Sequence, residues 1–220
     1  MKYHKVALGG TFDHFHIGHE ALITKAFEIG ECVVIGVTSD DFARRKFQKK
    51  AVVNQNFGSS SVSLVNEQSG DTQPIRHSQS EDSQNFIDSF TERKHHVQQL
   101  INQKNWENRV EIIELPDVYG PTITDASFDA IVVSPETEPA GHLINTKRRE
   151  VGLTPLEIIV VPWIRARDGE PIHSTRIREG RIGRDGTVFS IDQSWGVRRI
   201  PESLRQFFKN PIGTFIAGDK

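Results

Sequence analysis

The sequence predicts an α/β protein with a Rossmann-like, doubly wound parallel sheet of five strands. Three observations support this fold class. Short apolar runs bounded by turn residues recur along the chain, segments of helical pattern lie between the runs, and the runs are rich in Val and Ile. Runs that are apolar on both faces are typical of parallel strands covered by helices. Strands and helices that alternate along the chain favour the doubly wound arrangement.

The expected elements alternate in order along the chain. Strands are expected at Lys5–Leu8, Cys32–Val37, Arg109–Leu115, Phe128–Ser134 and Leu156–Trp163. Helices are expected at His19–Ile29, Asp40–Lys46, Phe86–Asn102 and Ala140–Val151, with a short one that begins near Ser174.

Length and composition limit the classes of protein to which the chain can belong. A chain of 220 residues, 36% of them hydrophobic, can bury one sizeable core with a small appendage. A net charge of −2 argues against nucleic acid as a partner. With no signal-peptide core and no apolar run near the ~20 residues that cross a bilayer, we expect a cytoplasmic protein without a membrane partner. The single cysteine, Cys32, excludes an intrachain disulfide, argues against a zinc cluster and is expected to be buried.

Two regions depart from the alternation. Residues 51–85 are heavy in Ser, Gln and Asn, so we expect a mobile low-complexity insert within a domain that spans residues 1–181. Residues 182–220 form a C-terminal extension, in which "IPESLRQFFKNPIG" predicts a helix after Pro201 that ends at Asn210.

The stretch "GGTFDHFHIGH" (Gly9–His19) forms a strand-to-helix junction, which is where ligands bind in open α/β sheets. Gly9 and Gly10 let the main chain turn sharply and approach a phosphate, and Thr11 adds a hydroxyl donor. The helix that follows favours an anion at its N-terminus.

Two histidines lie at the entrance of that helix. His16 and His19 are three residues apart, so both rings can lie on one face, and Gly18 keeps the surface between them flat. The pair alone could form half a metal site, but a lone pair of this kind is more often an ordinary surface feature. The full pattern G-x-F-D-x-x-H-x-G-H after the first strand is far more restrictive and favours nucleotide binding. Asp13 is expected to be an Asx-type turn residue rather than a metal ligand.

A second motif, "IHSTRIR" (Ile172–Arg178), follows the last expected strand. Ser174 is a good N-cap, and the amides of the next residues point outward at a helix start. Arg176 and Arg178 add positive charge for the β- and γ-phosphates of a nucleotide. Alone, the motif also fits a capped surface helix with its arginines in water. Its pairing with the first motif favours phosphate binding.

Both motifs resemble signatures of the nucleotidyltransferase superfamily. The first is similar to its T/H-x-G-H motif, which binds a nucleotide triphosphate, and the second to I-S-S-T-x-x-R. His173 stands where the family has serine, which puts any role of that serine in doubt. The resemblance implies an ATP site formed by Gly9, Gly10, Thr11, Phe12, Gly18, His19, Ser174, Thr175, Arg176 and Arg178.

Longer segments resemble one family within that superfamily. "VIGVTSDDFARRK", "VVSPETEPAGHLINTKRREVGLTPLEIIVV" and "HSTRIREG" are similar to the archaeal and eukaryotic type of phosphopantetheine adenylyltransferase. The similarity covers Lys5–Arg181 apart from the insert. It implies adenylyl transfer from ATP to 4′-phosphopantetheine, which gives dephospho-coenzyme A and pyrophosphate in coenzyme A synthesis.

The chemistry of the acceptor predicts what the site residues do. A phosphate monoester with a second pKa of about 6 is largely dianionic near neutrality, so it needs alignment and charge neutralisation rather than a protein nucleophile. We expect catalytic roles for His16 and His19 at the α-phosphate and for Lys46 and Arg148 at the acceptor, with Thr11 and Asn145 also in the acceptor site. The neighbouring basic residues Arg44, Arg45, Lys147 and Arg149 fit the acceptor phosphate as well. Mg²⁺ is expected to be carried by the triphosphate, with no metal ligand among the protein side chains.

Three alternatives stay open at this stage. The chain fits another transferase of the superfamily, acting on nicotinamide mononucleotide, flavin mononucleotide or a CTP-dependent acceptor, and it fits a non-catalytic nucleotide-binding protein. An aminoacyl-tRNA synthetase fragment fits poorly, because the K-M-S-K-S loop is absent.

The tail resembles the opening of the archaeal GTP-dependent dephospho-coenzyme A kinase, although a terminal helix packed on the sheet explains it equally well. The oligomeric state is not predicted.

Overall fold

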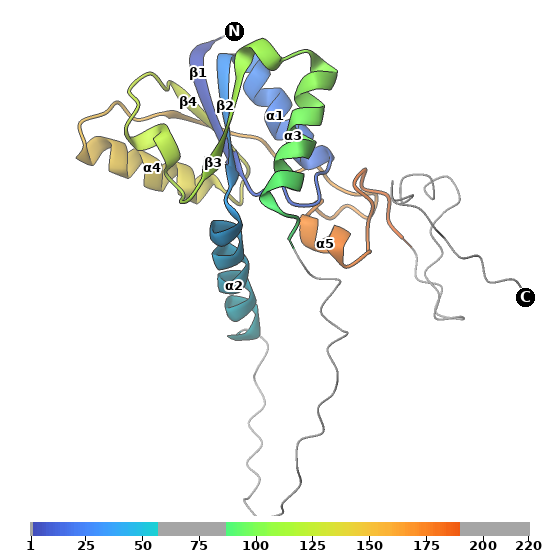
Figure 1. The fold of residues 1–220 in the computed structure, drawn as a ribbon. Helices are drawn as coiled ribbons and strands as arrows, with labels where there is room; N and C mark the ends of the chain where they lie inside the picture. Colours follow the sequence, from blue (N-terminus) through green and yellow to red (C-terminus); the bar gives the residue numbers. More distant parts are fainter. Residues whose placement is uncertain (1, 57–86, 190–220) are drawn as a thin grey trace, which may run out of the picture.

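A computed structural model describes residues 2–56 and 87–189 of the protein (Figure 1). Five parallel strands form one sheet in the order β3-β2-β1-β4-β5, which confirms the predicted fold class. The strands are β1 (Tyr3–Gly10), β2 (Gly30–Thr38), β3 (Val110–Leu115), β4 (Ala130–Val133) and β5 (Glu157–Val160).

Helices connect the strands and cover both faces of the sheet. They are α1 (Ile17–Ile29), α2 (Asp40–Asn56), α3 (Phe90–Lys104), α4 (Glu138–Glu150) and α5 (Ser174–Arg178), with 3₁₀ turns η1 (Glu107–Arg109) and η2 (Gly120–Ile123). Figure 1 shows α1 and α3 on one face of the sheet and α4 on the other, while α2 extends away from the sheet. This two-sided cover is the doubly wound arrangement.

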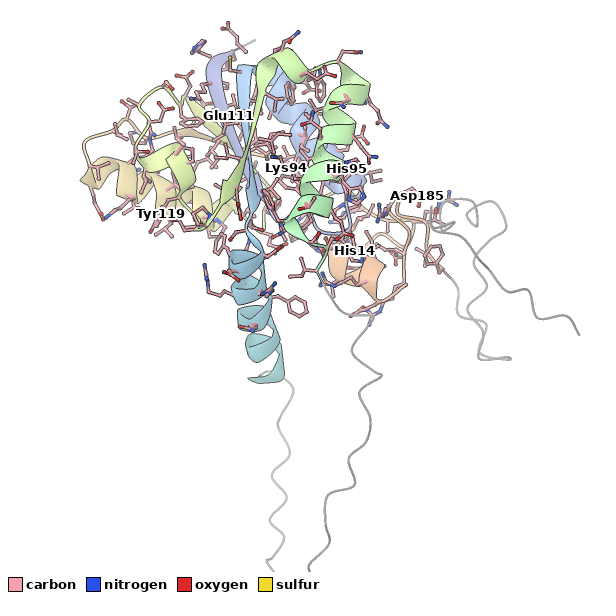
Figure 2. The ribbon with its side chains drawn as sticks, in the orientation of Figure 1. His14, Lys94, His95, Glu111, Tyr119 and Asp185 are labelled. Atoms are coloured by element: carbon pink, nitrogen blue, oxygen red, sulfur yellow. The ribbon has the colours of Figure 1, made fainter. Side chains whose placement is uncertain are left out.

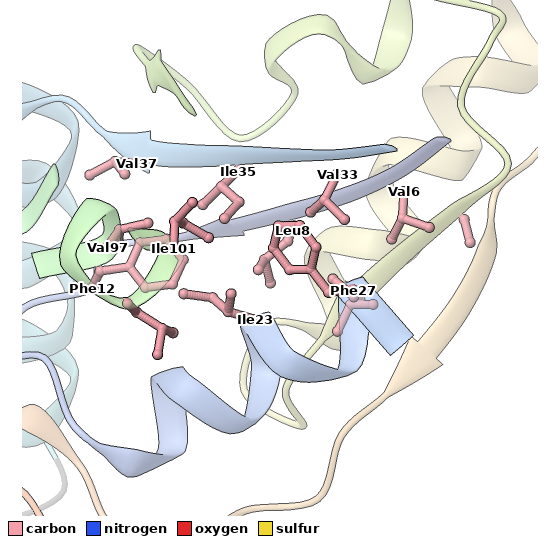
Figure 3. Close-up of a cluster of buried hydrophobic side chains, with 14 residues drawn as sticks. Val6, Leu8, Phe12, Ile23, Phe27, Val33, Ile35, Val37, Val97 and Ile101 are labelled. Carbon is pink, nitrogen blue, oxygen red and sulfur yellow. The ribbon is translucent and has the colours of Figure 1, made fainter. Parts of the chain in front are cut away.

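Two apolar clusters hold the layers together. Val6 and Leu8 of β1 pack with Ile23 of α1 and Ile101 of α3 in the larger cluster (Figure 3). Ala7 points to the opposite face and packs in the cluster beneath α4 and η2. Because both faces of β1 are buried at Val6, Ala7 and Leu8, all three of these successive residues are apolar.

Strand order places a topological switch point beside β1. β1 pairs with β2 on one side and with β4 on the other, and the chain has to cross over to reach β4. Ligands of doubly wound sheets bind outside the carboxyl ends of the strands at such a point. The first motif begins at this end of β1.

The insert is shorter than the sequence predicts. Helix α2 continues from the expected end at Lys46 to Asn56, so residues 51–56 are helical rather than part of a loop. The segment contains Ala and Gln, which are good helix formers, and it continues the helical run that starts at Asp40. The remainder of the predicted insert lies outside the described residues.

The expected burial of Cys32 is wrong. The side chain is exposed, because β2 starts at Gly30 and its first residues after the glycine lie at the uncovered amino end of the strand. Among residues 2–56 and 87–189, no helix has the length and apolar character needed to cross a bilayer.

The first residues of the predicted C-terminal extension pack on the domain. Residues 181–189 form a hairpin in which Ile182 pairs with Val188. Ile182 is buried against Ala166 and Ile172 in a third apolar cluster. The carbonyl of Arg184 accepts a hydrogen bond of 3.1 Å from the Ile17 amide at the start of α1. The helix predicted after Pro201 and the rest of the extension lie outside the described residues.

Candidate active site

The loop of the first motif turns tightly between β1 and α1. Phe12 and His14 adopt positive φ angles of 57° and 45°. The Phe12 ring is buried in the core cluster of β1, and a Cβ on Gly10 would lie only 2.9 Å from that ring. Gly10 is therefore required for the ring to fold back beneath the loop. Gly18 has a similar role, because a Cβ there would lie 3.0 Å from the His16 ring.

The two histidines of the motif stack on each other. Their ring centroids are 3.8 Å apart and the ring planes differ by 21°. His16 is the N-cap of α1, and its Nδ1 accepts a hydrogen bond of 3.1 Å from the Gly18 amide. His19 also contacts the rings of Phe12 and Phe15. One face of the α1 entrance therefore carries both imidazoles.

Burial keeps both imidazoles neutral. It lowers the pKa of His16 to about 4, with repulsion from His173 as a smaller cause. Burial also holds the pKa of His19 well below its usual range. Because Nδ1 of neutral His16 accepts from Gly18, its proton lies on Nε2. His16 can then donate to a ligand oxygen from Nε2 without being charged.

The low pKa of His16 makes the protein less stable in weak acid. In the unfolded chain His16 binds a proton near its ordinary pKa of about 6.5, whereas the folded protein resists protonation down to about pH 4. The unfolded state thus gains more protons as the pH falls from 7 to 5. We expect the free energy of unfolding to drop by up to about 1.4 kcal/mol per pH unit from this group.

Denaturant unfolding at pH 7, 6 and 5 measures this drop. His16→Asn should reduce the slope with pH, because asparagine keeps the N-cap but does not titrate. Equal slopes in the wild type and His16→Asn would refute the assignment.

The second motif contacts the first directly. Ser174 Oγ of α5 donates a hydrogen bond of 2.7 Å to the main-chain carbonyl of Asp13, and the Arg178 guanidinium forms an ion pair with the Asp13 carboxylate. Arg178 also lies 5.0 Å from the ring centroid of Phe47 in α2. Helices α2 and α5 therefore meet beside the loop of the first motif.

Ser174 is not the N-cap that the sequence predicts. His173 occupies the N-cap position and makes no side-chain capping bond, and Ser174 is the first helical residue. The serine hydroxyl binds Asp13 instead of its own helix. The His173 ring packs edge-on against Trp163, with centroids 5.6 Å apart.

Asp13 connects the two motifs. Its Oδ1 accepts hydrogen bonds from the Asp88 amide at 2.9 Å and from His14 at 3.0 Å, and its Oδ2 binds Arg178. Burial raises the pKa of Asp13, but these hydrogen bonds and the charge of Arg178 outweigh burial and leave the pKa below its usual value. The carboxylate is therefore ionised at neutral pH.

Asp13, His14 and Asp88 also lie close enough together to share a cation. His14 sits in the loop next to α5 (Figure 2). Oδ1 of Asp13 already accepts from Asp88 and His14, and Oδ2 binds Arg178, so a cation here would compete with these contacts.

The remaining predicted ATP residues lie around this junction. Thr11 and Thr175 are half-buried or exposed, and Thr175 Oγ1 accepts a hydrogen bond of 3.1 Å from Arg178. Arg176 is already paired, because it binds the Asp168 carboxylate and donates to the carbonyl of Pro171 at 3.0 Å. Lys46 lies in the second turn of α2, next to Phe47, with its ammonium 5.7 Å from the Phe42 ring centroid.

The structure does not bring Arg148 and Asn145 to the two motifs. Arg148 is completely buried and donates to the carbonyls of Thr154, Thr122 and Asp125. Asn145 exchanges two hydrogen bonds, of 2.7 and 2.8 Å, with the backbone of Leu156. Both side chains tie α4 to the loops at its ends. Both side chains are buried in these contacts, and Nη2 of Arg148 is buried without a hydrogen-bond partner among the described residues.

Sequence reasoning missed Arg93. Its side chain is completely buried and donates hydrogen bonds to Thr11, just after β1, and to Thr38, the last residue of β2. A signal was present, because Arg93 stands in line with Val97, Leu100 and Ile101 at the i, i+4, i+7 and i+8 spacing of a buried helix face. A charged residue in that register indicates a buried, paired cation.

The first and second motifs meet beside a stacked histidine pair on a doubly wound sheet, and this arrangement defines a nucleotidyltransferase. Residues 7–56 match the cytidylyltransferase-like family model. A phosphopantetheine adenylyltransferase of Methanopyrus kandleri is 37% identical over 80% of this chain and 90% of its own length. That of Methanothermobacter thermautotrophicus is 36% identical over 93% and 96%. The chain belongs to the phosphopantetheine adenylyltransferase family of archaeal type. Among solved structures, an Archaeoglobus fulgidus protein of unknown function is 31% identical, with a TM-score of 0.49 over 73% of this chain and 89% of that one.

Proposed function

We propose that the protein transfers the adenylyl group of ATP to 4′-phosphopantetheine and releases pyrophosphate. The observation that supports this most is the junction at Asp13, which places α5 against the loop that carries His16 and His19. The relatives bear the name of this activity. The substrates are then two small molecules, and neither nucleic acid nor a membrane is needed. The reaction products belong to coenzyme A synthesis.

The site residues act by alignment and by neutralising charge. The acceptor phosphate is itself the nucleophile, so no covalent intermediate with the protein forms. His16, through Nε2–H, and His19 donate hydrogen bonds to the α-phosphate, whose oxygens gain charge in the transition state. Because both rings are neutral, they stabilise this charge as fixed donors rather than as acids.

Cationic side chains hold the outer phosphates and the acceptor. Arg178, paired with Asp13 and almost completely buried, holds α5 and its Thr175 beside the triphosphate, and Lys46 binds the acceptor phosphate beside Thr11. Mg²⁺ bound to ATP would supply further charge neutralisation at the phosphates, and we assign no protein side chain to hold it. The assigned residues come from the first motif, α2 and α5, and these three segments meet at the carboxyl end of β1.

Incubation with ATP, Mg²⁺ and 4′-phosphopantetheine tests the proposal. We expect dephospho-coenzyme A and pyrophosphate in equal amounts. A panel with nicotinamide mononucleotide and flavin mononucleotide as acceptors, and with CTP as donor, identifies a different transferase. ATP binding without turnover of any acceptor would overturn the proposal in favour of a nucleotide-binding protein.

Lys46→Ala should weaken acceptor binding more than ATP binding. A charge-assisted hydrogen bond contributes about 1.5–3 kcal/mol, so we expect KM for 4′-phosphopantetheine to rise about 10- to 100-fold. The KM for ATP should change much less. Steady-state kinetics with each substrate varied in turn gives both values. Lys94→Ala, on the outer face of α3 (Figure 2), is the control and should change neither. Equal rises in both KM values would remove Lys46 from the acceptor site.

A further inference from the structure

Arg93 is a cation in the middle of an apolar helix face. It lies on α3 with Val97, Leu100 and Ile101, and its side chain has no exposed surface. A buried charge is costly unless hydrogen bonds satisfy it. The contacts of Arg93 must therefore offset the cost of burying its charge.

Hydrogen bonds from the guanidinium reach three segments of the chain, at Thr11, at residues 38–40 and at Asp88. NH1 donates to the carbonyl of Thr11 at 2.9 Å, to the carbonyl of Thr38 at 2.8 Å and to Thr38 Oγ1 at 3.1 Å. Nε donates to the carbonyl of Asp88 at 2.8 Å, and NH2 forms an ion pair of 2.9 Å with Asp40. All three nitrogens are used.

These acceptors share one position in the fold. Thr11 is the first residue after β1, Thr38 is the last of β2, and Asp40 is the first of α2. At such points the chain leaves the ladder of the sheet, and its carbonyls need other partners. A single nitrogen atom binds both the Thr11 and the Thr38 carbonyls, which holds the two segments together just beyond Gly10 and Val37, the last residues that β1 and β2 pair in the sheet.

Ion pairing does not explain this arrangement. Asp40 is the one carboxylate among the five acceptors, and its side chain is 41% exposed. The other four acceptors are neutral oxygens, three of them main-chain carbonyls. The guanidinium therefore acts mainly as a planar fork that sets the direction of backbone groups.

We propose that Arg93 is a positioning residue for adenylyl transfer. It locks the loop that carries Thr11 and the histidines to the start of α2, which carries Lys46, and it touches neither substrate. The inference rests on the proposed function, because the spacing that Arg93 fixes is the spacing between the nucleotide and its acceptor. A displacement of about 1 Å between reacting groups can cost about 100-fold in rate.

Arg93→Lys tests the inference, because lysine keeps the charge but has a single nitrogen and cannot bind the acceptors in all three segments. We expect kcat to fall about 100-fold while KM for ATP stays within about three-fold of the wild type. The matched control is Arg109→Lys. Arg109 donates to the carbonyls of Glu31, Phe27 and Gly30 at the amino end of the sheet. We expect a similar loss of thermal stability there with kcat unchanged.

Hydrogen exchange measures the positioning independently of turnover. In Arg93→Lys, amide exchange should speed up in residues 10–16 and 38–46, and in Arg109→Lys these segments should exchange as in the wild type. An inactive wild type would contradict the proposed function alone, since the exchange result still tests the role of Arg93. Exchange and kcat in Arg93→Lys that match those in Arg109→Lys would overturn the inference.

A second pair of variants decides the matter if Arg93→Lys does not fold. Asp40→Ala removes the contact of Arg93 with α2 from its exposed side, while Asp40→Asn keeps an oxygen that accepts from NH2. We expect Asp40→Ala to speed up exchange in residues 38–46 and to lower kcat about 10-fold, and Asp40→Asn to restore most of both. Wild-type behaviour of Asp40→Ala would overturn the inference.

Discussion

His19→Ala is expected to lower kcat about 100- to 1000-fold while the Kd for ATP stays within about three-fold of the wild type. The reason is the difference between the ground state and the transition state. The α-phosphate gains charge only as the acceptor attacks, so a fixed donor at that position stabilises the transition state most. Loss of such a donor costs about 2.7–4 kcal/mol.

The structure explains why the donor is fixed. The His19 ring is held by Phe12, Phe15 and the stacked ring of His16, and burial keeps it neutral. A donor that is already in place needs no rearrangement when the reaction occurs. A flexible, solvated histidine would give a much smaller effect.

Single-turnover and steady-state kinetics measure the effect of His19→Ala on kcat, and calorimetry measures its effect on the Kd for ATP. His95→Ala is the matched control, since His95 is exposed on the outer face of α3 (Figure 2). It should retain wild-type kcat. A His19→Ala variant with unchanged kcat would rule out the role assigned to this ring, and a large loss of ATP affinity at constant kcat would make it a binding residue instead.

The fold was predictable because local pattern and tertiary burial agree along most of the chain. β1 and β4 are apolar on both faces and are covered on both sides, so their sequences directly report their environment. Cys32 shows where this reasoning fails. Residues at an end of a strand that no helix covers can be as apolar as those in its middle. The sequence therefore does not show which residues of the strand are exposed.

The candidate site was predictable only in part, because several contacts join distant segments. The sequence indicates a cap at Ser174, but the hydroxyl binds the carbonyl of Asp13, 161 residues away. Arg148 resembles a ligand-binding residue in a basic cluster, yet it shares a buried helix face with Ile144, four residues before it. Helical register, applied to charged as well as apolar residues, would have identified Arg148 and Arg93 as buried.

Asp13→Asn should have the largest effect on stability of any single change in the two motifs. Asp13 and Arg178 are both almost completely buried, with 4% and 5% of their side chains exposed. Removing the carboxylate charge leaves the Arg178 guanidinium buried without its counter-ion. Breaking a buried pair in this way costs about 3–5 kcal/mol. We expect that loss in the free energy of unfolding, together with a fall in kcat as α5 loses its attachment to the first motif.

The same helix supplies the control. Arg176 of α5 pairs with Asp168, but that pair is partly exposed, and water can replace the lost partner. Asp168→Asn should therefore cost less than about 1 kcal/mol. The double variant Asp13→Asn/Arg178→Met removes the stranded charge, so its unfolding free energy should exceed that of Asp13→Asn alone. Urea unfolding of the four proteins tests this order. Equal losses of unfolding free energy in Asp13→Asn and Asp168→Asn would mean that the Asp13–Arg178 pair does not hold the two motifs together. A buried pair differs from a surface contact because its loss leaves the Arg178 charge buried without a partner.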